Sequence, residues 1–132
     1  PYDLLEENPR TRQLHKRYSE LNEIYERQVK KALEEMDEKK KTLLFSYSGH
    51  VSMSSEIANK LYFLYPEKII IVAFKKPEKI NVSIRGAGAL DLTHKIVDKI
   101  EGAMGGGHEE ATGAMIPVDK WEEFVEMVED KA

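Results

Sequence analysis

Apolar and polar positions follow two different periods along the chain, and these periods predict one long helix followed by alternating strands and helices. Over residues 8–41, apolar side chains recur mostly at steps of three and four, which predicts an amphipathic helix with a narrow seam. Pro9 suits its first turn, and no Gly or Pro interrupts the segment from there to residue 41. The seam consists of Leu14, Tyr18, Leu21, Tyr25, Val29, Ala32 and Met36. At about 45 Å, the helix would extend beyond a domain of about 25–30 Å.

The segments after residue 41 predict an α/β domain with a mixed sheet flanked by helices. Ile80, Val82 and Ile84 alternate with polar residues, which is typical of a strand with one packed face. Strands are predicted at 42–48, 68–74, 80–86 and 114–118, helices at 53–65, 91–100 and 119–128, and a glycine-rich loop at 102–113. We therefore expect residues 1–41 to form a long linker helix and residues 42–132 to form the domain.

Composition and charge narrow the possible functions. The chain has no cysteine, which excludes disulfides and thiolate metal sites, and it has neither a secretory leader nor an apolar run that could span a bilayer. We therefore expect a cytoplasmic protein without membrane contact. A charged fraction of 33%, rich in Lys and Glu, is typical of the ion-pair networks of thermophile proteins. The net charge of −4 argues against a protein that coats long nucleic acid, so a phosphate would be held at a local site.

The stretch "GAMGGGHEEATG" at 102–113 is the first candidate site. Three consecutive glycines, Gly105 to Gly107, can turn backbone N–H groups toward an anion, and a following helical turn would add more. His108 supplies a donor that can carry charge near neutral pH. The alternative is a glycine helix cap with a flexible turn and a merely exposed histidine.

The stretch "VSIRGAG" at 82–88 is the second candidate site, because Arg85 follows Ser83 on the polar face of a predicted strand. A guanidinium group pairs bidentately with phosphate and can stack on a base, although a lone surface arginine in an ion pair is the alternative. The two candidate stretches lie at the two ends of one predicted helix, so they can meet around a ligand only if the sheet brings them together. The stretch "GAGALD" is not a dinucleotide-binding fingerprint, because Asp91 occupies the position of its third glycine.

Other polar residues give weaker signals. The hydroxyl-rich stretch at 46–55, which contains His50, could contact a ligand or cap a helix. No Asp and His cluster has metal-ligand spacing, and there is neither a Ser/His/Asp arrangement nor a pair of catalytic carboxylates. The chain is therefore equipped to hold a ligand rather than to hydrolyse one.

Together these motifs resemble the C-terminal, DHH-associated domain of the DHH phosphoesterase superfamily, which includes RecJ-type exonucleases, nanoRNases and cyclic-dinucleotide phosphodiesterases. The family pattern runs Ser-x-Arg-Ser, then Asp-Val/Leu, then Gly-Gly-Gly-His-x-x-Ala-x-Gly. This chain has "SIRG" at 83–86, "DL" at 91–92 and "GGGHEEATG" at 105–113. The resemblance covers about 42–130. Gly86 replaces the second serine of the family pattern, and Met104 replaces a common additional glycine.

The resemblance implies binding of the phosphate and nucleotide end of a short single-stranded DNA or RNA, or of a dinucleotide. The residues implied to bind substrate are Ser83, Arg85, Gly86, Gly105, Gly106, Gly107, His108 and Gly113. It also implies that a two-metal centre of Mn²⁺ or Mg²⁺ belongs to a separate N-terminal DHH catalytic domain, outside this chain. The chain is then the non-catalytic half of a metal-dependent phosphodiesterase, with no catalytic residue, metal ligand or cofactor of its own.

Two alternatives come from other classes of protein. The chain could be a stand-alone nucleotide-binding protein without hydrolytic activity, or an assembly module that forms a homodimer through the seam between Leu14 and Met36. A relative of the domain ends many alanyl-tRNA synthetases and would imply tRNA binding, but the acidic charge balance counts against it.

Overall fold

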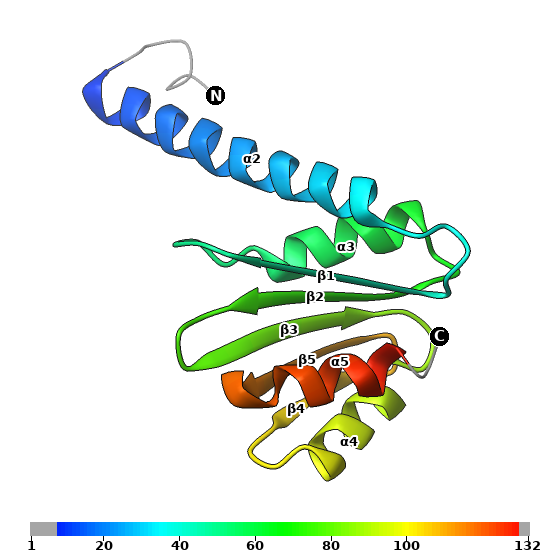
Figure 1. Cartoon of the computed structure of the whole chain (residues 1–132). Coiled ribbons are helices and arrows are strands. Elements are labelled where there is room, and N and C mark those ends of the chain that lie inside the picture. Colours follow the sequence, from blue (N-terminus) through cyan, green and yellow to red (C-terminus); the bar gives the residue numbers. More distant parts are fainter. Residues whose placement is uncertain (1–7, 130–132) are drawn as a thin grey trace.

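The computed structural model describes residues 8–129 and contains a five-stranded mixed sheet with the order β1-β2-β3-β5-β4 (Figure 1). The strands are β1 (Thr42–Ser48), β2 (Ile69–Lys75), β3 (Lys79–Arg85), β4 (Met104–His108) and β5 (Ala111–Pro117). β1 and β2 are parallel, and every other neighbouring pair is antiparallel. The predicted α/β fold with a mixed sheet is therefore confirmed.

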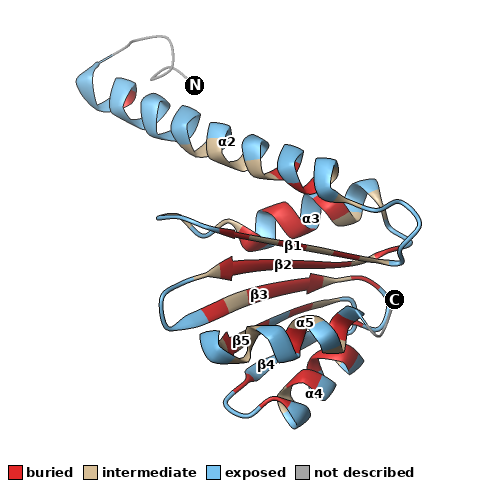
Figure 2. Ribbon diagram, in the orientation of Figure 1, coloured by how far each residue is buried: buried red, intermediate tan, exposed pale blue. Residues whose placement is uncertain are grey.

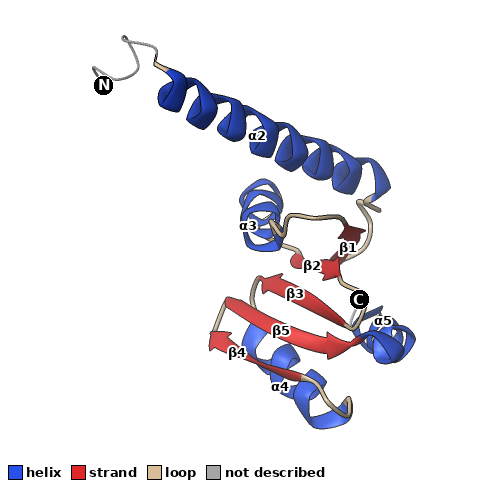
Figure 3. Ribbon diagram, turned by 90° about the vertical axis from the view of Figure 1, so that its left-hand side faces the viewer, coloured by secondary structure: helices blue, strands red, loops and turns tan. Residues whose placement is uncertain are grey.

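Helices cover both faces of the sheet and bury a separate apolar cluster on each. The helices are α2 (Pro9–Glu35), α3 (Ser54–Leu64), α4 (Ala89–Lys99) and α5 (Trp121–Glu129), the last preceded by a 3₁₀ turn at Val118–Lys120. α2 and α3 pack with Ile70, Val72 and Phe74, whereas α4 and α5 pack with the alternate strand residues, such as Ile71 and Ile84. In Figure 3, α3 and α5 accordingly lie on opposite sides of the sheet. None of the helices described in residues 8–129 combines the length and apolar content needed to cross a membrane.

The long helix α2 is shorter than the sequence pattern predicts, because it ends at Glu35 and not near residue 41. Residues 36–41 form a loop that is held by Lys68, a side chain only 5% exposed. The Lys68 ammonium donates to the backbone carbonyls of Asp37, Glu38 and Lys40. A buried ammonium requires such partners, so the loop supplies carbonyls that a continuous helix would have used internally. The division of the chain at residue 41 stays a prediction, and residues 1–7 lie outside the described residues.

Only the C-terminal half of α2 packs on the domain. Val29 and Ala32 are buried against α3 and β1, but Leu14 is 62% exposed and Tyr18 is 71% exposed. Figures 1 and 2 show the N-terminal half extending away from the sheet as a mostly exposed rod. The predicted overhang is confirmed. The predicted homodimer stays a prediction, and it can use only the free part of the seam, because the other part is already buried within the same chain.

We expect substitutions along one seam to have unequal effects on stability. Val29→Ala should lower the free energy of unfolding by about 2 kcal/mol, since two buried methyl groups are lost. Leu14→Ala should change it by less than about 0.5 kcal/mol, because that side chain is exposed. Urea unfolding followed by circular dichroism measures both values, and equal losses would contradict the observed packing of α2.

Candidate functional site

The glycine-rich stretch is not a loop followed by a helical turn, as the sequence suggested, but the first strand of a hairpin. Met104–His108 form the edge strand β4, which pairs with β5 through a two-residue turn at Glu109 and Glu110. The backbone carbonyl of Glu110 accepts a hydrogen bond from the Gly86 amide (2.9 Å), and that of Glu109 accepts one from the Leu90 amide (3.2 Å). The tip of the hairpin is therefore fastened to the start of α4.

The three glycines of β4 face two different environments. A Cβ on Gly105 would lie 2.8 Å from the Gly113 carbonyl oxygen and 2.9 Å from Thr93 Cγ2 on α4. A Cβ on Gly107, whose φ is +145°, would lie 2.5 Å from the Ala111 carbonyl oxygen. A Cβ on Gly106 would have no neighbour within 4 Å. The absence of side chains at Gly105 and Gly107 is thus explained by packing, whereas Gly106 leaves an open surface.

The strand register brings the predicted site residues onto one face of the sheet. Arg85 pairs with Ala111, which in turn pairs with His108. In the next row on this face, Ser83 pairs with Gly113, and Gly113 pairs with Gly106. Side chains opposite one another in an antiparallel ladder point to the same face. This is the face on which α3 covers β2 and β3, whereas Gly106, His108 and Gly113 are exposed.

Arg85 links the three elements that surround this open face. Its Nε donates to Asn59 Oδ1 on α3 (2.7 Å), and one terminal nitrogen donates to the carbonyls of Ile84 (2.9 Å) and Thr112 (3.1 Å). All three of these acceptors, which belong to the described residues 8–129, are neutral, so none of these bonds neutralises the guanidinium charge. Partial burial lowers the pKa of Arg85, because desolvation disfavours the charged form. A partly desolvated cation with neutral partners is suited to bind an anion.

The start of α3 adds hydroxyl groups beside this arginine. Ser83 donates to Ser54 Oγ at 3.1 Å, and Ser55 Oγ lies 3.5 Å from Ser83 Oγ. The serines do not cap the helix, because its N-cap is Met53, which makes no side-chain capping bond. The Met53 amide instead donates to the Tyr47 hydroxyl (2.7 Å). The pKa of Tyr47 is raised, mainly because the hydroxyl is partly buried.

The structure therefore divides the predicted residues into groups. Ser83, Arg85, Gly106, His108 and Gly113 lie on one face of the sheet, which we call the Arg85 face. Ser83 is buried beside Ser54 of α3, Arg85 is half-buried, and the other three are exposed. Gly105 and Gly107 point toward α4 and β5, and Gly86 turns toward Lys68, whose carbonyl oxygen would lie 2.8 Å from an added Cβ. Sequence reasoning did not assign Asn59 to the site. A single asparagine in a helix carries no signal until the sheet places it beside Arg85.

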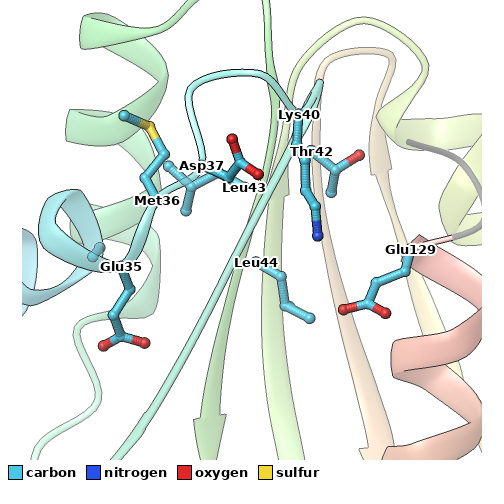
Figure 4. A pocket seen from close by; sticks show the side chains of 9 residues that line it. Glu35, Met36, Asp37, Lys40, Thr42, Leu43, Leu44 and Glu129 are labelled. Atoms are coloured by element: carbon cyan, nitrogen blue, oxygen red, sulfur yellow. The ribbon is translucent and has the colours of Figure 1, made fainter.

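A separate hollow lies where the end of α2, the start of β1 and the end of α5 meet (Figure 4). Its lining includes the carboxylates of Glu35, Asp37 and Glu129 and the ammonium of Lys40, but no residue of the Arg85 face. Three carboxylates against one ammonium disfavour a phosphate here. Within residues 8–129, no group of three or more His, Cys, Asp or Glu side chains is placed to hold a metal ion.

Comparisons with known proteins identify the family model that the chain matches. The model of the DHHA1 domain matches residues 38–132. No curated protein sequence matches the chain.

Solved structures share the fold at low sequence identity. RecJ from Thermus thermophilus in complex with Mg²⁺ is 18% identical with a TM-score of 0.74, and the match covers 92% of this chain and 19% of that chain. The pGpG-specific phosphodiesterase PggH from Vibrio cholerae is 14% identical with a TM-score of 0.57, over 93% of this chain and 44% of that chain. The C-Ala domain of Aquifex aeolicus alanyl-tRNA synthetase is 18% identical with a TM-score of 0.57, over 72% of this chain and 96% of that chain. The chain thus spans less than half of the first two proteins.

Alanine substitutions should distinguish the two environments within β4. Gly107→Ala should lower the free energy of unfolding by at least about 2 kcal/mol, because the added Cβ clashes with backbone and the φ is unfavourable. Gly106→Ala should change it by less than about 0.5 kcal/mol, since its side chain meets open space. Chemical unfolding of both variants tests this, and a Gly106 variant that unfolds as readily as the Gly107 variant would contradict the assignment.

Proposed function

Because this chain belongs to the DHHA1 domain family, we propose that its Arg85 face binds the phosphate-bearing nucleotide end of a short single-stranded nucleic acid. The observation that carries the proposal is the meeting of Arg85, His108 and the open surface of Gly106 on one exposed face. Arg85 and His108 lie in one row with Ala111 between them, and the neighbouring row contains Gly113 and Gly106, which have no side chains. An anion held by these donors can therefore approach the backbone of the neighbouring row closely. Because the net charge of the chain is −4, we expect an anion to be attracted only at this local site.

In this proposal the chain positions the substrate, and a DHH catalytic domain supplies the metal ions and the hydrolysis. The support comes from the domain family and from the absence of a metal-holding group among residues 8–129. Holding the nucleotide end in a fixed place aligns the scissile bond with a separate catalytic centre. Binding of tRNA is less well supported, because the net charge of −4 disfavours attraction to a large nucleic acid.

Titration with a 5′-phosphorylated dinucleotide, followed by NMR, tests the proposal. We expect chemical-shift changes in residues 83–88 and 104–113. Arg85→Gln and His108→Ala should each weaken binding about tenfold or more, because each removes a charge-assisted hydrogen bond to phosphate. His94→Ala is the matched control, since His94 is an exposed histidine on α4 away from the Arg85 face. Unchanged affinity in both site variants, or shift changes around Asp37 and Lys40 instead, would refute the proposed site.

A bulky substitution at Gly106 provides a second test. Gly106→Val should leave the fold intact, because there is room for the side chain and valine favours strands. It should nevertheless reduce dinucleotide binding at least about tenfold, since the side chain would stand where the ligand approaches. Unfolding measurements and the same titration separate the two effects. A Gly106→Val protein that binds as tightly as the original would show that this surface does not contact the ligand.

A further inference from the structure

The side of α3 that borders the Arg85 face carries three residues at four-residue spacing, which places them in one row along the helix. The first, Ser55, lies beside Ser83, and the second, Asn59, accepts the hydrogen bond from Arg85. The third is Phe63, one turn further on, about 6 Å along the helix axis from Asn59. The row therefore leads from the proposed phosphate site to an aromatic ring.

Phe63 does not contribute to the core. It is 78% exposed, whereas Ile57, Ala58 and Leu61 on the other side of α3 are completely buried. The Lys60 ammonium lies 5.7 Å from the centre of the Phe63 ring, close enough for a cation–π contact. An aromatic ring thus stands in solvent next to a cation, at the end of the row that contacts Arg85.

We propose that Phe63 is a stacking platform for the base of the nucleotide whose phosphate lies at Arg85. This inference rests on the proposed function, because Arg85 must hold the phosphate for Phe63 to meet the base. Because the Lys60 ammonium lies over one face of the ring, the base would stack on the opposite face. Asn59, which belongs to the same row of α3 as Phe63, is a positioning residue, because it accepts the hydrogen bond that orients the guanidinium of Arg85.

The chemistry of stacking determines which ligands this subsite accepts. Every base has a π face, so stacking on an aromatic ring tolerates any base sequence. The base must be unpaired and unstacked to expose that face, as in a single strand or a mononucleotide. The subsite would therefore favour single-stranded ends and discriminate little among the four bases.

Two ligands that differ only in the base separate this inference from the proposed function. Adenosine 5′-monophosphate carries phosphate, ribose and base, whereas ribose 5-phosphate lacks the base. Titrations followed by NMR should show that the protein binds the nucleotide more tightly, and that the Phe63 ring resonances shift only with the nucleotide. Phe63→Ala should weaken nucleotide binding about tenfold and leave ribose 5-phosphate binding unchanged, while Phe63→Tyr should restore nucleotide binding.

Leu64→Ala is the matched control, because Leu64 is an exposed apolar neighbour on the same helix, at 41% exposure. If Phe63→Ala binds the nucleotide as tightly as the original protein, or if the base-free ligand binds equally well, the stacking platform is overturned and the phosphate site stands. If neither ligand binds the original protein, the proposed function fails, and this inference fails with it.

Discussion

The close approach of β4 to α4 and β5 is the constraint on which the candidate site depends. Gly105 and Gly107 have no room for a side chain on that side, and the hydroxyls of Thr93 and Thr112 form a hydrogen bond at 2.6 Å in the same interface. Successive strand residues point to opposite faces, so with Gly105 and Gly107 packed on the α4 side, Gly106 and His108 lie on the opposite face. Arg85 lies on this same face of the sheet. Packing thus accounts for the glycines on one face, whereas the open backbone on the other face comes from Gly106, where a side chain would have room.

Arg85 connects this surface to the rest of the domain. It emerges from the end of β3, and its hydrogen bonds reach α3 through Asn59 and β5 through the Thr112 carbonyl. These contacts fix the direction of the guanidinium before any ligand binds, which lowers the ordering cost of binding. The acceptors contribute no formal charge, so they orient the cation without neutralising it. The same contacts explain why α3, rather than the hairpin alone, borders the proposed site.

Much of the fold could be predicted from the sequence, because period-two and helical patterns coincide with burial. The strand predicted at 42–48 matches β1, and the helix predicted at 53–65 differs from α3 by one residue at each end. The strand β4 could not be predicted, since glycine disfavours strands and a Glu-Glu turn gives no hairpin signal. The end of α2 depends on Lys68, thirty-odd positions away in the sequence. The residue types of the site follow from its motifs, but which of them share a face follows only from the strand register.

The one-sided anchoring of α2 has a consequence for the proposed division of labour. An apolar seam of constant period is buried at Val29 and Ala32 and open at Leu14 and Tyr18, so the domain fixes the direction of the helix from one end only. The 27 residues of α2 contain no glycine and no proline after Pro9, and such a helix is much stiffer than a flexible linker. In the proposed division of labour, a substrate held at Arg85 has to meet a separate catalytic centre with ångström precision. On the proposed function, a stiff helix that keeps two parts of an enzyme in a defined relation serves that need, whereas a flexible connection would spread the scissile bond over many positions.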